Sequence, residues 1–216
     1  MINRLIFLLC MLIFQLHLIA QSSLPIDTLG SSDASKPVVF YITGDGGFNS
    51  FSTSFMQQLN DKGYPVVALN AKSYFWKTKT PEAAANDVSA LLTEYLNKWH
   101  RSEIIFAGYS LGADVLSFIQ TRLPATIASK IKHTVLLSPS NTTDFTVHLF
   151  YNSNGSDVPA EINKLSKPVL VIFGKEETDT PAAKIKNQMA MIMTVPGDHH
   201  YNNQVLFLTN EIIKRL

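Results

Sequence analysis

The sequence predicts an α/β fold in which a mostly parallel sheet of about six strands carries helices on both faces. Several short runs, such as VVFYIT at 38–43, are apolar at every position rather than at every second one. Continuous apolar runs are typical of strands that are covered on both faces. These runs alternate with segments of helical periodicity, and that alternation is the pattern of parallel strands joined by helices.

The individual elements follow from the same patterns. Strands are predicted at 38–43, 65–69, 103–107, 133–137, 168–173 and 189–195. Helices are predicted at about 50–62, 81–99, 111–123 and 203–216. The segment 140–167 is rich in Asn and contains Gly155 and Pro159, so we expect a small lid or insertion there.

The length and composition fit one globular domain. The 216 residues are 46% hydrophobic and 16% charged, which is enough apolar material to bury a core without disulfides or a structural metal. The 18 Lys and Arg nearly balance the 17 Asp and Glu. The charge balance gives no sign of a basic face, so we expect no nucleic-acid partner.

The first twenty residues have the features of a secretory signal peptide. Arg4 precedes an apolar run, and Ala20 supplies a small residue at the expected cleavage point. An uncleaved membrane anchor is the alternative, but Gln15 and His17 interrupt a run that is already short for a bilayer span. We therefore expect residues 1–20 to direct export to the periplasm and to be removed.

Cleavage at that point would also remove Cys10, the only cysteine. The mature protein would then have no disulfide and no thiol nucleophile. We expect a flexible segment at 21–36, followed by a single α/β domain at 37–216.

The segment IIFAGYSLGADV contains the pattern G-x-S-x-G as Gly108, Ser110 and Gly112. It lies directly after a predicted strand and before a predicted helix, which is the setting of a nucleophile elbow. The helix N-terminus would also favour negative charge at Ser110. The alternative is a tight turn whose serine caps the helix. The position between strand and helix favours Ser110 as a nucleophile.

A serine nucleophile needs a histidine base, and the order expected after it is acid and then histidine. PGDHHY, after the last strand, supplies His199 and His200. We favour His199, the first that can turn back over the sheet, and keep His200 as the alternative. The acid is expected after the fifth strand, where Glu177 and Asp179 both qualify. The sequence leaves the choice between these two open.

Amide donors for a developing oxyanion are expected at two places. The first is the backbone N–H of Leu111, just after the serine. The second is the glycine-rich loop TGDGGF, through the N–H of Asp45 or Gly46. This loop lacks the G-x-G-x-x-G and G-K-[ST] patterns of nucleotide sites. No residue set predicts a metal or another cofactor.

Five motifs together resemble one known family. They are TGDGGF (43–48), YFWKTKTPE (74–82), GYSLGADVL (108–116), GKEETDT (174–180) and PGDHHY (196–201). In this order and spacing they resemble the family of the bacterial virulence protein VirJ, which also includes the C-terminal half of AcvB. The resemblance spans most of the chain from Val38 onward.

This resemblance implies an α/β-hydrolase exported to the periplasm, with Ser110 as nucleophile and the PGDHHY histidine as base. It also implies hydrolysis of aminoacylated phosphatidylglycerol and a link to type IV secretion in virulence. Tyr74 and Trp76, together with Phe75, would then lie near the substrate pocket, although ordinary core packing is the alternative.

The sequence therefore predicts an exported serine hydrolase of a carboxylic ester, whose substrate could carry a membrane-lipid head group. Two other functions remain open. One is a non-catalytic periplasmic partner of a secretion system on a hydrolase scaffold, and the other is a thioesterase or dienelactone-type hydrolase.

Overall fold

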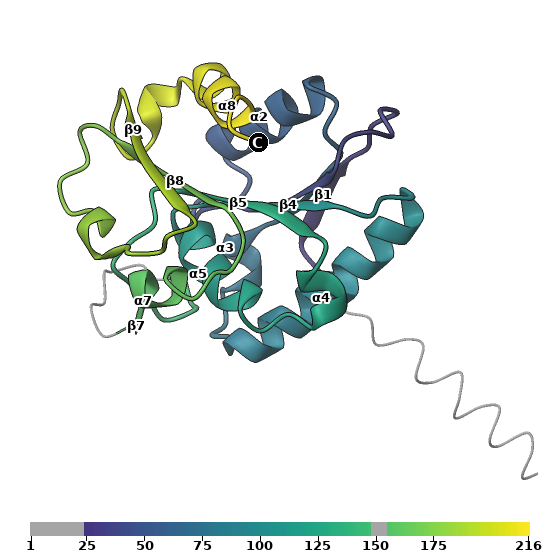
Figure 1. The fold of residues 1–216 in the computed structure, drawn as a ribbon, viewed down its shortest axis with the longest axis horizontal. Helices are drawn as coiled ribbons and strands as arrows, with labels where there is room; N and C mark the ends of the chain where they lie inside the picture. Colours follow the sequence, from purple (N-terminus) through teal and green to yellow (C-terminus); the bar gives the residue numbers. More distant parts are fainter. Residues whose placement is uncertain (1–23, 148–154) are drawn as a thin grey trace, which may run out of the picture.

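The computed structural model describes residues 24–147 and 155–216, and a seven-stranded sheet forms its centre (Figure 1). The spatial order of the strands is β1-β3-β2-β4-β5-β8-β9. Their bounds are β1 Ile26–Leu29, β2 Val38–Ile42, β3 Val66–Leu69, β4 Ile104–Tyr109, β5 Ile131–Leu137, β8 Val169–Gly174 and β9 Ala190–Val195. All strands of this sheet except β1 pair in parallel, and these six strands match the six predicted runs.

The predicted flexible segment 21–36 is wrong for four of its residues, because Ile26–Leu29 form strand β1. This strand pairs antiparallel with β3, with Ile26 opposite Leu69 and Leu29 opposite Val66. It escapes a search for apolar runs because it is short and includes the polar pair Asp27 and Thr28. Its backbone pairing covers β3, so β1 is the edge strand on this side of the sheet.

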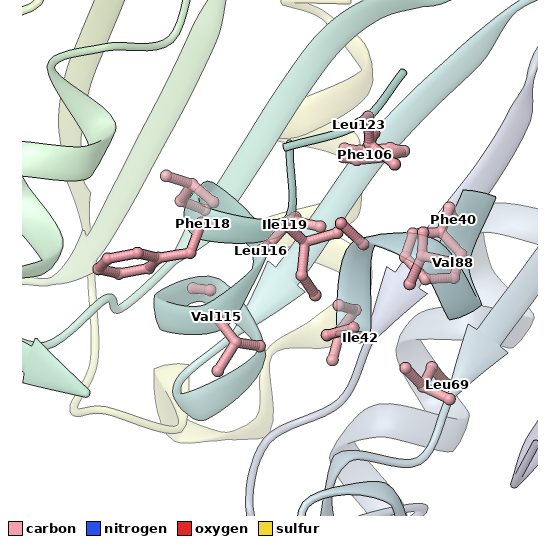
Figure 2. Packing of buried hydrophobic residues seen from close by; sticks show 14 of the residues in the cluster. Phe40, Ile42, Leu69, Val88, Phe106, Val115, Leu116, Phe118, Ile119 and Leu123 are labelled. Carbon is pink, nitrogen blue, oxygen red and sulfur yellow. The ribbon is translucent and has the colours of Figure 1, made fainter. Parts of the chain in front are cut away.

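Helices cover both faces of the sheet, as the alternating pattern predicts (Figure 1). One face carries α2 (Ser50–Asp61) and α8 (Val205–Ile213), and the other carries α3 (Ala71–Tyr74), α4 (Pro81–Lys98) and α5 (Leu111–Gln120). Each face has its own apolar core. On the α4–α5 face, strand residues Phe40, Ile42 and Phe106 pack against helix residues such as Val88 and Ile119 (Figure 2).

The connections hold short elements that the sequence patterns do not predict. They are α6 (Ala125–Ala128), β6 (Thr142–Thr143), β7 (Ser156–Asp157), α7 (Val158–Ile162) and two 3-10 turns at Ala182–Lys184 and Tyr201–Asn203. The β6–β7 ladder and α7 lie within the predicted insertion at 140–167. Residues 148–154 of this insertion lie outside the described part of the chain.

The predicted signal peptide at 1–20 also lies outside the described residues. Among the helices of residues 24–147 and 155–216, none combines the length and apolar character needed to span a bilayer.

The start of α5 packs very closely against the neighbouring strands. A Cβ on Gly112 would lie 2.1 Å from the carbonyl oxygen of Ile42 in β2. A Cβ on Gly108 would lie 2.5 Å from the carbonyl oxygen of Gly112. Only glycine permits both approaches, and they hold the turn between β4 and α5 against the sheet.

Gly112→Ala should destabilise the fold, because the new methyl group would meet backbone atoms that cannot move aside. We expect a loss of about 2–4 kcal/mol in the free energy of unfolding. Urea denaturation measures this loss. Gly30→Ala is the matched control, since no atom lies within 4 Å of its added Cβ. Equal stability of the two variants would contradict the close packing of α5.

Candidate active site

Ser110 occupies a strained turn between β4 and α5. Its φ is 51° and its ψ is −121°, a region that non-glycine residues rarely adopt. Its backbone N–H donates to the carbonyl of Leu137 (2.9 Å), and its carbonyl accepts from the N–H of Asp114 (3.0 Å). The hydroxyl makes no capping bond to the helix. The side chain of Ser110 is thus held at the carboxyl edge of the sheet and is available for other contacts.

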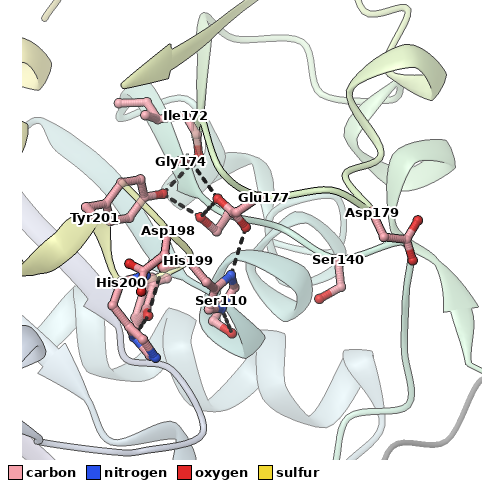
Figure 3. Close-up of polar contacts among 12 residues, drawn as sticks. Ser110, Ser140, Ile172, Gly174, Glu177, Asp179, Asp198, His199, His200 and Tyr201 are labelled. Atoms are coloured by element: carbon pink, nitrogen blue, oxygen red, sulfur yellow. Dashed lines mark hydrogen bonds and ion pairs between the residues drawn. The ribbon is translucent and has the colours of Figure 1, made fainter. Parts of the chain in front are cut away.

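His199 extends from the connection between β9 and α8 toward this serine (Figure 3). Its Nε2 lies 3.0 Å from Ser110 Oγ, and its Nδ1 lies 2.8 Å from Glu177 Oε2. The hydrogen bond to Glu177 raises the pKa of the imidazole above 6.5, against the lowering effect of burial. The three side chains therefore form one hydrogen-bonded line, with His199 between Ser110 and Glu177. In the sequence they follow the predicted order serine, acid, histidine.

Two glycines bring the His199 connection close to the sheet. Gly197 has a φ of 115°, which side-chain-bearing residues rarely adopt. A Cβ on Gly174, at the end of β8, would lie 2.1 Å from the carbonyl oxygen of Asp198. The carboxylate of Asp198 then accepts from the backbone N–H groups of His200 (2.9 Å) and Asn202 (3.1 Å). These contacts fix the direction in which His199 leaves the backbone.

His200, the alternative base, points elsewhere. Its side chain is exposed, and its Nδ1 lies 2.6 Å from the hydroxyl of Tyr109. The structure therefore brings His199, and not His200, to Ser110.

Glu177 is held by more groups than the histidine alone. Its Oε1 accepts from Ser138 Oγ (2.6 Å) and from the backbone N–H of Gly174 (2.5 Å). The Ser138 hydroxyl also lies 2.7 Å from the hydroxyl of Tyr201. Burial opposes ionisation of Glu177, but the bonds from His199, Ser138 and Gly174 outweigh it and hold the pKa below the ordinary value. Glu177 is thus arranged to stay ionised beside the imidazole.

Asp179, the other predicted acid, makes no bond to His199 among the described residues. Its exposed carboxylate instead lies 3.3 Å from Asn141 Nδ2. It does line the same small cavity as His199 and Glu177, about 130 Å³ in volume. The remaining residues that line this cavity are Ser138, Pro139, Ser140, Asn141 and Thr180.

The predicted oxyanion donors belong to two segments, the start of α5 and the loop after β2. Leu111 is the first residue of α5. The loop after β2 lies against the serine, because a Cβ on Gly44 would be 3.4 Å from Ser110 Cβ. Asp45 and Gly46 follow in this loop and are exposed. The loop itself is closed by a hydrogen bond from the N–H of Gly47 to the carbonyl of Gly44 (3.0 Å).

The predicted substrate-binding aromatics lie outside the 130 Å³ cavity. Tyr74 is buried and donates its hydroxyl hydrogen bond to Asp87 Oδ2 (2.5 Å), and Phe75 is fully buried. Both are therefore core residues, which is the alternative that the sequence left open. Trp76 is 60% exposed, and its role in substrate binding stays a prediction.

Ser138 and Tyr201 are the partners of the site that the sequence patterns did not identify. Ser138 directly follows the predicted strand 133–137. Its position at the carboxyl edge of the sheet could therefore have identified it as a candidate site residue. No group of three or more His, Cys, Asp or Glu side chains within the described ranges is arranged to hold a metal ion.

The chain is similar to solved structures with the α/β-hydrolase fold. The esterase Est1E from Butyrivibrio proteoclasticus, solved with ferulic acid, is 17% identical, with 89% of this chain and 93% of that chain covered and a TM-score of 0.64. A proline iminopeptidase from Mycobacterium smegmatis is 12% identical, with 88% and 93% covered and a TM-score of 0.67. A putative dienelactone hydrolase from Klebsiella pneumoniae is 14% identical, with 89% and 91% covered and a TM-score of 0.61.

At these identities the likeness establishes the fold. No sequence among the curated proteins matches the chain. The model of one protein family, described as bacterial virulence protein (VirJ), matches residues 36–216. This match covers the whole sheet from β2 to β9 and every residue of the serine–histidine–glutamate line, and so the chain belongs to the VirJ family of bacterial virulence proteins.

Proposed function

We propose that this protein is an exported serine hydrolase that cleaves a carboxylic ester. The observation that carries this proposal is the line from Ser110 Oγ to His199 Nε2 (3.0 Å) and from His199 Nδ1 to Glu177 Oε2 (2.8 Å). A serine hydroxyl needs such a base to become a nucleophile near neutral pH. The base in turn needs an acid that fixes its tautomer and its orientation.

In the first half of the reaction, Ser110 Oγ attacks the ester carbonyl while His199 Nε2 takes the hydroxyl proton. The charge that develops on the carbonyl oxygen is met by the N–H of Leu111 and the N–H of Asp45 or Gly46. His199 then gives the proton to the leaving alcohol, and an acyl-serine remains. In the second half, His199 takes a proton from water and the water oxygen attacks the acyl carbonyl. The bond between the acyl carbon and Ser110 Oγ then breaks, His199 returns the proton to Oγ, and the carboxylic acid leaves.

Glu177 keeps Nδ1–H of His199 in place through both halves and stabilises the imidazolium form. Its second oxygen is already occupied by Ser138 and Gly174, so the carboxylate has little freedom to rotate away from the ring. This support favours hydrolysis over a purely structural role for the three residues, because it keeps the acid aligned with the imidazole that contacts Ser110.

For the substrate we propose an aminoacyl ester of phosphatidylglycerol. The family resemblance implies this class of ester, and the carboxylate of Asp179 on the wall of the cavity would complement the positive charge of an aminoacyl group. The signal peptide predicted at 1–20 would deliver the enzyme to the periplasm, where such lipids are accessible. A thioester or a dienelactone would engage the same residues and differ only in the fit to the cavity.

Ser110→Ala should abolish hydrolysis of both p-nitrophenyl acetate and lysyl-phosphatidylglycerol, because it removes the attacking oxygen. We expect a loss of at least about 10³-fold in kcat with the fold intact. Initial rates on the chain from Gln21 onward, checked by circular dichroism, measure this loss. Cleavage of the small ester alone would keep the mechanism and discard the lipid. A folded wild type that is inactive on esters and thioesters would favour the non-catalytic partner of a secretion system.

Glu177→Gln should lower kcat by about 10²–10³-fold, because the amide cannot stabilise the imidazolium and can hold the wrong tautomer. Steady-state kinetics on p-nitrophenyl acetate provide the measurement. Glu176→Gln is the matched control, since Glu176 is the exposed neighbour on the same loop. If Asp179→Asn lost more activity toward this neutral ester than Glu177→Gln, the assignment of the acid would be overturned.

The activity should fall as the pH drops through the raised pKa of His199, because only the neutral imidazole can take a proton from Ser110. We expect the acid limb of the kcat/KM profile to have its midpoint above 6.5, the ordinary value for histidine. In Glu177→Gln the midpoint should move to lower pH, since the largest cause of the raised pKa is gone. Rates measured between pH 5 and pH 9 decide this, and an unmoved midpoint would contradict the coupling of the two residues.

A further inference from the structure

A fourth polar residue, Asp114, lies in the first turn of α5, close to Ser110. It follows Ser110 by one helical turn, and its backbone N–H donates to the Ser110 carbonyl (3.0 Å). Its side chain is buried, with 4% of its surface exposed. One carboxylate oxygen accepts from the backbone N–H of Ser140 at 2.6 Å. The triad described above makes no use of this carboxylate.

A buried carboxylate is costly unless its surroundings favour the charge. Burial raises the pKa of Asp114 to about 7, while the hydrogen bonds from Ser140 and the charge of His199 act in the opposite direction. Asp45, on the loop after β2, raises it further. Among these neighbours, His199 is the one group that can carry a positive charge. The imidazole feels the same interaction, because Asp114 contributes to its raised pKa after Glu177.

We propose that Asp114 is a positioning residue of the site, whose buried carboxylate holds the loop after β5 and, once ionised, supplies a negative charge that stabilises His199 in its protonated form. This inference rests on the proposed function. It adds a second acid that acts on the imidazole through space, in addition to Glu177, which acts through a hydrogen bond.

The contact with Ser140 links this role to the rest of the site. Ser140 lies on the wall of the 130 Å³ cavity (Figure 3). The same loop begins with Ser138, the donor to Glu177. Asp114 thus ties the loop that supports Glu177 to helix α5, which directly follows Ser110. When His199 takes the serine proton, its positive charge is stabilised by the hydrogen bond to Glu177 and by the charge of Asp114.

Asp114→Asn separates the charge from the hydrogen bond. The amide oxygen can still accept from the N–H of Ser140, but the negative charge is gone. We expect the pKa of the His199 imidazole to fall by about half a pH unit to one pH unit, and kcat to fall about three- to tenfold with KM little changed. The imidazole is followed by NMR titration and assigned by the loss of its signal in His199→Asn. Asp61→Asn, an exposed change of equal charge at the end of α2, is the control and should alter neither quantity.

Stability gives a second readout. Because the pKa of Asp114 is higher in the folded protein than in the unfolded chain, its ionisation removes stability as the pH rises from about 4 to about 7. Asp114→Asn has no carboxyl group to ionise at this position, so it does not lose this stability as the pH rises. Its Tm should therefore exceed that of the wild type by several degrees at pH 8 and approach the wild-type value near pH 4. This pattern follows from the burial of Asp114 and would show that its carboxyl group ionises in the folded protein, while the His199 titration decides whether the charge acts on the imidazole.

Ser140→Ala is a milder variant that keeps the backbone bond and removes a hydroxyl donor to Asp114. Asp114 should then ionise at a higher pH, so the pKa of His199 should fall in the same direction as in Asp114→Asn but by less. An unchanged His199 titration in both variants would overturn the proposal. The NMR titration does not depend on activity, so it decides the role of Asp114 even if a folded wild type cleaves no ester, which would defeat the proposed function instead.

Discussion

The close approach of α5 to the strands β2 and β4 is the constraint on which the site depends. Gly108 and Gly112 let the helix start within contact distance of the backbone of β2 and β4, and the chain must then turn sharply between them. Ser110 sits at that turn with a positive φ. The strain is tolerated because hydrogen bonds to Leu137 and Asp114 hold the serine backbone on both sides. Without this contact, the hydroxyl would have no fixed position relative to His199.

The sheet then determines which other residues can reach the serine. In a parallel sheet the carboxyl ends of all strands lie at one edge, so the connections after β5, β8 and β9 converge there. These connections supply Ser138, Glu177 and His199, residues that are far apart in sequence. The glutamate has a longer side chain than the more usual aspartate, and its carboxylate is held by donors from two strands, Ser138 after β5 and Gly174 at the end of β8. Side-chain length and backbone support together place the acid at the imidazole.

The sequence predicted the main strands because they are apolar at nearly every position, as in Val38–Ile42 and Ile104–Tyr109, and the main helices because apolar residues recur in them at helical spacing. Strand β1 was not predicted because its four residues include the polar pair Asp27 and Thr28, and helix α3 was not predicted because four residues give no helical period. For the site, the motif and the chain order pointed to Ser110 and His199. The choice between Glu177 and Asp179 could not be made, because it depends on how the loop after β8 turns and on the hydrogen bond that Glu177 accepts from Ser138, a residue outside the motif. The burial of Tyr74 likewise depends on packing with distant residues.

The direction of β1 determines where the chain enters the domain. Because this strand runs antiparallel to β3, Ile26 lies beside Leu69, at the same edge of the sheet as Ser110. The carbonyl of Pro25 accepts from the N–H of Asn70 (2.8 Å), which fixes the entry point there. A parallel β1 would have placed the entry about 13 Å away, at the opposite edge. Any anchor, tag or fusion partner joined ahead of Leu24 is therefore attached on the serine side of the domain, and immobilisation through that end would turn the opening of the site toward the support.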